Sequence, residues 1–144
     1  MNSEGKELTK NLKEIYSTYF DQEYLDKNLE IPKIYLDSIG KISVKDLYKL
    51  GSIPNTVWGI DLYGNEFLER KNSNTLTKKD KIYLTIGDWG SHHDFHINCD
   101  KSSPDFGKIF DYNDAHPWCE SHEPEVEWAD FREFLKDDFK IELE

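Results

Sequence analysis

The feature that most constrains this chain is the run of residues 81–87, in which side chains of two kinds alternate cleanly. One face of the run is aliphatic throughout and consists of Ile82, Leu84 and Ile86. The other face carries Tyr83 and Thr85. Because successive side chains of a β-strand point to opposite faces, the alternation predicts a strand with one face against a core. The rest of the chain must supply the layer that packs on that face.

Further strands are expected on both sides of this run. Residues 94–99 and 107–112 predict the next two strands, which a turn-rich segment joins. Earlier in the chain, residues 56–60 and 66–70 flank a Tyr-Gly-Asn turn and predict a hairpin. The middle and the second half of the sequence therefore favour an antiparallel sheet.

Helical periodicity marks the two ends of the chain. Apolar residues recur three or four apart over residues 5–20 and again over 127–139. Between the first helix and the strands, residues 29–40 contain a proline near their start, Pro32, that suits a first turn, and they close with a glycine suited to a helix end. Ser43 opens a further helix in a pattern close to a capping box. The order of helices, strands and a last helix predicts an α+β fold in one domain, residues 1–144.

Charge is distributed unevenly along the sequence. The whole chain has a formal net charge of -11. Residues 1–87 hold 13 acidic and 13 basic side chains, whereas residues 88–138 hold 14 acidic and only 4 basic ones. The acidity is thus a property of one segment. It argues against nucleic acid or an anionic membrane as a direct partner and favours a basic protein.

The beginning of the chain and its apolar runs indicate a cytoplasmic protein. The first ten residues contain no apolar core of a secretory signal, and no apolar run approaches the length that crosses a bilayer. Only two cysteines are present, Cys99 and Cys119, in a chain rich in aromatic residues. This pattern is more typical of free thiols than of a disulfide framework.

The acidic segment interleaves carboxylates with large aromatic rings, which is a composition typical of protein-binding surfaces. Tryptophan buries much area at low entropic cost, and carboxylates steer a basic partner toward its docking position. The predicted partner-binding residues are Asp88, Trp89, Asp94, Asp111, Asp114, Trp118 and Glu120.

Two alternatives use the histidine, cysteine and aspartate residues between positions 92 and 122. His96 with Cys99 and Cys119 with His122 form mirror-image pairs that a zinc ion could use, although residues three apart on a strand point to opposite faces. A small hydrolase could instead use Asp94, His96 and Asn98 on one strand face. The chain contains none of the common catalytic or phosphate-binding sequence motifs, so we expect neither catalytic residues nor a cofactor.

Short motifs spread over the chain resemble the SUKH superfamily. They are the strand run 82–90 with its Gly-Asp-Trp-Gly end, the strands 94–98 and 107–110, an Ile-Pro-x-x-Tyr segment ending at Tyr35, and Trp128-x-x-Phe131-x-x-Phe134-Leu135. After Tyr35 the family often has a Phe-Leu pair and an Asn-Gly-Gly turn, where this chain has residues 36–40 with one glycine.

The resemblance implies a single α+β domain with a curved, mostly antiparallel sheet packed against N-terminal helices and a C-terminal helix. In bacteria it implies an immunity protein that binds and neutralises a secreted polymorphic toxin, often a nuclease. It brings no catalytic residues. Relatives connected with fungal cell-wall regulators act as binding proteins, so a regulatory scaffold for an endogenous partner is an alternative to immunity. The expected partner is in either case a protein, and for immunity a basic toxin domain.

Overall fold

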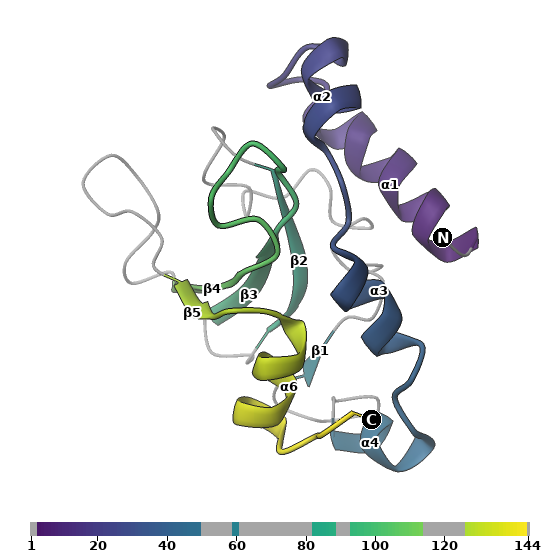
Figure 1. Ribbon diagram of the computed structural model, residues 1–144, viewed down its shortest axis with the longest axis vertical. Helices are drawn as coiled ribbons and strands as arrows, with labels where there is room; N and C mark the ends of the chain where they lie inside the picture. Colours follow the sequence, from purple (N-terminus) through teal and green to yellow (C-terminus); the bar gives the residue numbers. More distant parts are fainter. Residues whose placement is uncertain (1–2, 50–58, 61–81, 89–92, 114–125, 144) are drawn as a thin grey trace.

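The computed structural model describes residues 3–49, 59–60, 82–88, 93–113 and 126–143 of the chain (Figure 1). Within these described residues, four helices come first, then five strands and a last helix. The helices are α1 (Ser3–Tyr16), α2 (Gln22–Asn28), α3 (Lys33–Ile39), α4 (Val44–Lys49) and α6 (Phe131–Phe139). The strands are β1 (Gly59–Ile60), β2 (Tyr83–Asp88), β3 (His93–Asn98), β4 (Ile109–Asn113) and β5 (Val126–Trp128). The predicted α+β class is confirmed.

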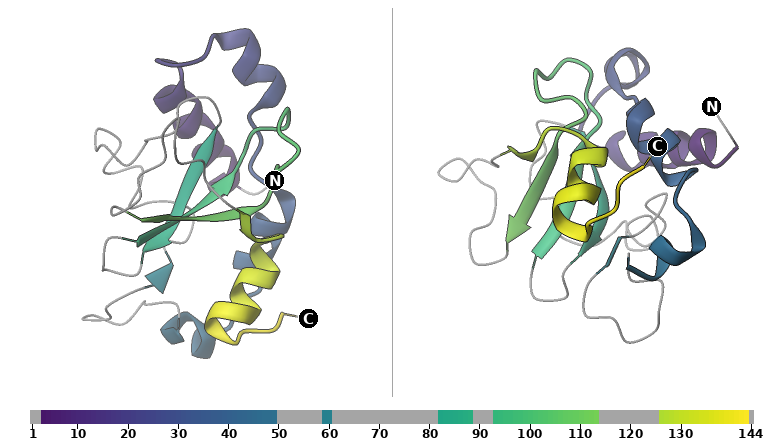
Figure 2. Two further views of the ribbon diagram at one scale, coloured as in Figure 1. Left: turned by 90° about the vertical axis from the view of Figure 1, so that its left-hand side faces the viewer. Right: turned by 60° about the horizontal axis from the view of Figure 1, so that its bottom comes forward.

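The strands form one sheet in the order β1-β2-β3-β4-β5, and every pair in it is antiparallel. The pairing of β2 with β3 shifts between Thr85 and Gly87, so Ile86 is an extra residue on β2. Such a bulge bends a strand and increases its twist. The strands accordingly fan out across the sheet in Figure 2, in agreement with the curved sheet expected from the sequence.

One face of the sheet packs against the helices. The aliphatic residues of the predicted strand face lie in this core together with residues of the neighbouring strands: Ile82, Leu84, Ile86, Phe95, Ile97 and Ile109. Leu12 of α1, Tyr35 of α3 and Phe134 of α6 fill the same core from the helical side. The alternation of residues 81–87 therefore predicted the core face of β2 correctly.

The N-terminal helix ends earlier than its periodicity predicts. The predicted helix covers residues 5–20, but α1 stops at Tyr16. The carbonyl of Tyr16 accepts hydrogen bonds from the N–H groups of both Tyr19 and Phe20. Asp21 then caps a second helix, which the sequence analysis missed, by accepting a 2.8 Å hydrogen bond from the N–H of Tyr24. The competing local cap is the physical reason for the break.

The helix predicted over residues 29–40 begins only at Lys33, after Pro32. Its first part instead lies beside the segment that follows β3, because Leu29 bridges to Asp100 and the N–H of Glu30 bonds to the carbonyl of Cys99 at 3.0 Å. The helix predicted to open at Ser43 is confirmed. Ser43 caps α4 by accepting a 3.2 Å hydrogen bond from the N–H of Asp46.

At the C-terminal end, the sequence predicts a helix over residues 127–139. The first part of this prediction is wrong. Val126–Trp128 form β5 at the edge of the described sheet, with Trp128 opposite Ile109. The helix starts at Phe131 because Asp130 caps it, while the side chain of Glu133 bonds back to the residue before the cap. Asp130 accepts from the N–H of Glu133, and Glu133 accepts from the N–H of Ala129, each at 2.9 Å.

Of the hairpin predicted over residues 56–70, the structure describes only Gly59–Ile60. These residues form β1 and pair with Gly87 and Asp88 of β2. The rest of that prediction lies outside the described residues. Among the helices that the structure describes, none has the length and apolar composition needed to cross a membrane.

A single hydroxyl group fastens the N-terminal helix to the sheet. The Tyr16 hydroxyl of α1 donates a 3.1 Å hydrogen bond to the carbonyl of Tyr83 and accepts a 2.9 Å hydrogen bond from the N–H of the same residue. Tyr16 is fully buried, and burial raises the pKa of its phenol, which therefore stays protonated and able to donate. The first residue of β2 is thus held by α1.

We expect Tyr16→Phe to destabilise the fold by about 1–3 kcal/mol, because it leaves buried backbone groups of Tyr83 without this partner. Urea unfolding followed by circular dichroism measures the change. The control is Ser17→Ala, which removes an exposed hydroxyl bonded to the carbonyl of Glu14 and should change stability by less than about 0.5 kcal/mol. Equal effects of the two substitutions would show that the buried hydroxyl does not fasten α1.

Candidate functional site

Three of the predicted partner-binding residues lie on adjacent strands at one end of the sheet. Asp88 near the end of β2 pairs directly with Asp94 of β3. Asp111 on β4 pairs with Phe95, the residue that follows Asp94. We refer to Asp88, Asp94 and Asp111 as the acidic sheet end.

Asp88 and Asp94 occupy directly opposite positions of the pair formed by β2 and β3. Like charges at directly opposite positions of an antiparallel pair are destabilising by a few tenths of a kcal/mol to about 1 kcal/mol. Asp111 on the next strand is half-buried, and because it pairs with Phe95 it shares the sheet face of that core residue. The register therefore places Asp88 and Asp94 on one face at this end of the sheet, and Asp111 on the face that packs against the helices.

The other predicted partner-binding residues, Trp89, Asp114, Trp118 and Glu120, lie outside the described residues. Trp89 follows Asp88 directly in the sequence, and Asp114 follows the last residue of β4. Two of the four are thus joined by one peptide bond to strand ends at the acidic sheet end. The part of all four in binding stays a prediction.

Two residues of the strand face proposed for a small hydrolase, His96 and Asn98, are buried. His96 is 1% exposed, its Nδ1 lies 3.0 Å from the Thr85 hydroxyl, and its ring packs edge-on against Tyr83. Burial lowers the pKa of the His96 imidazole to about 3, so the ring is neutral at pH 7.

Asn98 completes this face and has a structural role of its own. Its carbonyl oxygen accepts a 2.8 Å hydrogen bond from the N–H of Asp100, and its amide nitrogen donates to the Ser103 hydroxyl at 3.2 Å. These two contacts shape the loop after β3. The hydrogen bonds of His96 with Thr85, and of Asn98 with Asp100 and Ser103, therefore stabilise the fold.

The proposed zinc pair His96 and Cys99 is divided between two environments. Cys99 belongs to the core beneath the helices, where its thiol contacts the carbonyl of Ile97 at 3.7 Å. His96 packs against Tyr83, which clusters with Phe110 away from that core. Burial raises the pKa of the Cys99 thiol, and a thiol that stays protonated is a poor zinc ligand.

The second pair, Cys119 and His122, lies outside the described residues. In the part of the chain that the structure describes, no group of three or more His, Cys, Asp or Glu side chains is arranged to hold a metal ion.

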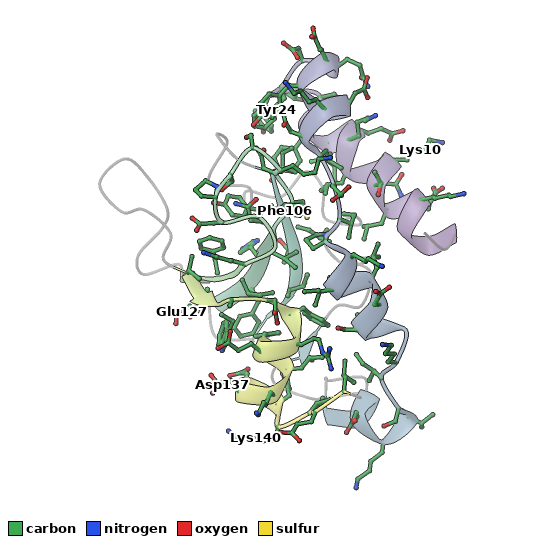
Figure 3. All side chains as sticks on the ribbon, viewed as in Figure 1. Lys10, Tyr24, Phe106, Glu127, Asp137 and Lys140 are labelled. Atoms are coloured by element: carbon green, nitrogen blue, oxygen red, sulfur yellow. The ribbon has the colours of Figure 1, made fainter. Side chains whose placement is uncertain are left out.

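The loop between β3 and β4 contains a buried carboxylate that the sequence analysis did not single out. Asp100 is 0% exposed, and its two oxygens accept hydrogen bonds from the Tyr24 hydroxyl at 2.6 Å and from the N–H and hydroxyl of Ser102 at 2.9 and 2.6 Å. Tyr24 extends from α2 toward this loop (Figure 3). Three donors compensate the buried charge, so Asp100 fastens the loop to α2. The polar run Asn98 to Ser103 was the available signal, since such residues commonly bond their own backbone in turns.

A second acidic and aromatic surface lies beside β5 and α6, where the sequence predicted continuous helix. It is an open hollow of about 700 Å³. Its lining consists of the ring of Trp128, the carboxylates of Glu127, Glu133, Asp137 and Glu142, and the ammonium groups of Lys136 and Lys140. We call it the Trp128 hollow. The labelled residues Glu127, Asp137 and Lys140 in Figure 3 follow one flank of β5 and α6.

No protein-family model, curated protein or solved structure matches this chain. The resemblance to the SUKH superfamily therefore stays a prediction from the sequence, and function must be argued from the surfaces described above.

The buried His96 makes stability depend on pH in a specific window. In the unfolded chain the imidazole binds a proton below its ordinary pKa of 6.5, whereas in the folded protein it does so only near 3. The unfolded state then binds more protons between these values, so stability should fall as the pH falls through that window, by up to about 1.4 kcal/mol per pH unit.

Urea unfolding between pH 6.5 and 5 tests this expectation in a range where exposed carboxylates are mostly ionised. His96→Gln keeps a polar side chain without a titrating ring, and we expect a shallower loss of stability with acid. An identical pH slope in the wild type and the variant would contradict a buried neutral His96.

Proposed function

We propose that this protein is a non-enzymatic immunity protein of SUKH type, which acts in the cytoplasm by binding and neutralising a cognate, basic toxin domain. The acidic sheet end is its central contact. A nuclease toxin holds the phosphates of its substrate in a cationic groove, and an acidic surface docked there would exclude the nucleic acid.

The observation that carries this proposal is the register of β2 and β3, which sets Asp88 directly opposite Asp94 at the end of the sheet. A fold gains no stability from acidic residues at opposed positions. Such an arrangement is expected where function requires concentrated charge, since natural proteins accept local instability at sites that bind partners.

The charge of the chain supports the same partner chemistry. Residues 88–138, which contain all three residues of the acidic sheet end, carry 14 acidic and 4 basic side chains. Charge complementarity of this kind mainly accelerates association and rejects partners of the same sign. It suits a protein that must capture one toxic partner quickly.

The observed architecture is compatible with the family resemblance. The resemblance implies a curved antiparallel sheet packed against helices, and the described sheet is antiparallel, bulged at Ile86 and covered by helices on one face. This agreement supports the proposal at the level of fold, and fold by itself does not imply function.

We expect the double variant Asp88→Asn with Asp94→Asn to associate about three to tenfold more slowly with the toxin encoded by the neighbouring gene at low salt, and to lose part of the salt dependence of that rate. The same variant should gain up to about 1 kcal/mol of folding stability, because it removes two like charges from directly opposite positions of the register. Stopped-flow association and urea unfolding measure the two effects.

The matched control is Glu7→Gln with Glu14→Gln, which removes the same charge from two exposed positions of α1. It should leave the association rate close to that of the wild type. Equal slowing by both double variants would assign the effect to net charge and sink the acidic sheet end as a specific contact. Binding to an endogenous protein and not to the neighbouring toxin would favour the regulatory scaffold instead.

A further inference from the structure

The Trp128 hollow has a rigid aromatic wall. The ring of Trp128 packs edge-on against Phe95 and Phe134, with ring centroids 5.8 and 4.8 Å apart. Its indole N–H donates a 2.9 Å hydrogen bond to Asp137. Because these contacts already hold the half-buried ring, a ligand packing on it would not have to order it first.

The charges around the ring favour a cation. Four carboxylates and two ammonium groups line the hollow, so its balance is negative. Glu133 and Asp137 are oriented by hydrogen bonds from the backbone N–H of Ala129 and from Trp128. These contacts fix two of the carboxylates in place before any ligand arrives.

One ion pair in the hollow is easily exchanged. Lys136 and Glu142 are 3.5 Å apart, and their side chains are 68% and 75% exposed. An exposed pair of this kind contributes little to stability, since water and salt screen it. An incoming cation can therefore take the place of Lys136 beside Glu142 at little cost.

We propose that the Trp128 hollow binds an arginine or lysine side chain of a protein partner, with arginine preferred. A guanidinium can stack on an indole and bond a carboxylate in the same plane, which a compact ammonium cannot do. The size of the hollow suits one or two side chains of a docked segment.

This inference goes beyond the proposed function, because it assigns a second contact built from β5 and α6. None of its residues belongs to the acidic sheet end. The two proposals can consequently fail separately.

The probe is a short blocked peptide with two arginines, and its control is the same peptide with citrulline, which has a similar shape but no charge. The indole N–H signal of Trp128 in a nitrogen-15 proton spectrum is assigned by its loss in Trp128→Phe. We expect a saturable shift of this signal with the arginine peptide and none with the citrulline peptide. An unmoved Trp128 signal in the presence of the arginine peptide overturns the proposal.

Two matched variants separate recognition from a general structural effect. Lys136→Gln and Glu142→Gln both remove the same ion pair, so their effects on the fold should be alike. Their effects on arginine-peptide affinity should be opposite. We expect the lysine variant to bind about two to fivefold more tightly and the glutamate variant about two to fivefold more weakly, as single exposed charges allow.

Affinity changes of the same sign in both variants would overturn the site. The peptide titration needs no toxin, so its outcome stands whether or not the sheet-end variants alter toxin association.

Discussion

The register of the central strands is the constraint on which the rest of the structure depends. Ile82, Leu84 and Ile86 must all face the helices, and a slip of one residue would turn every one of them away from the core. The extra residue at Ile86 then shifts the pairing once, so that Gly87 meets Phe95 and Asp88 meets Asp94. The position of the acidic sheet end is thus a consequence of how the apolar face is buried.

Buried polar groups in the described part of the chain mostly join elements that are distant in sequence. The Tyr16 hydroxyl holds the first residue of β2, and the Asp100 carboxylate holds Tyr24 of α2. Asn98 shapes the same loop from the end of β3. Such groups are costly to bury unless their partners are in place, so they specify the arrangement of helices on the sheet. The polar residues that first suggested metal binding or hydrolysis, His96 and Asn98, lie among these interior groups.

The acidic character of the protein is expressed on two surfaces of different kinds. The acidic sheet end brings acidic positions of three strands to one end of the sheet through strand register, and we propose that it steers a partner over a distance. The Trp128 hollow combines fewer net charges with a fixed aromatic ring, and it is suited to a local anchor. A basic partner could use the first surface for capture and the second for retention, which is how charge and aromatic contacts divide the work in many interfaces.

The sequence by itself determined the α+β class, the core face of β2, the cap of α4 by Ser43 and the location of the negative charge in the second half. These depend on periodicity, local hydrogen bonds and composition, which neighbouring residues specify. The ends of the helices and strands were less predictable. The helix α1 ends at Tyr16 because Asp21 caps a new helix. Trp128 belongs to a strand because it pairs with Ile109 of β4.

Only the tertiary structure decided that Asp88 opposes Asp94, that Asp100 is buried beneath Tyr24, and that Trp128 lines a hollow with the carboxylates of α6. Each of these contacts joins residues on different elements. The physical reason is that a pairing register or a side-chain cluster is chosen by the burial of the whole apolar face, which no local stretch of sequence encodes.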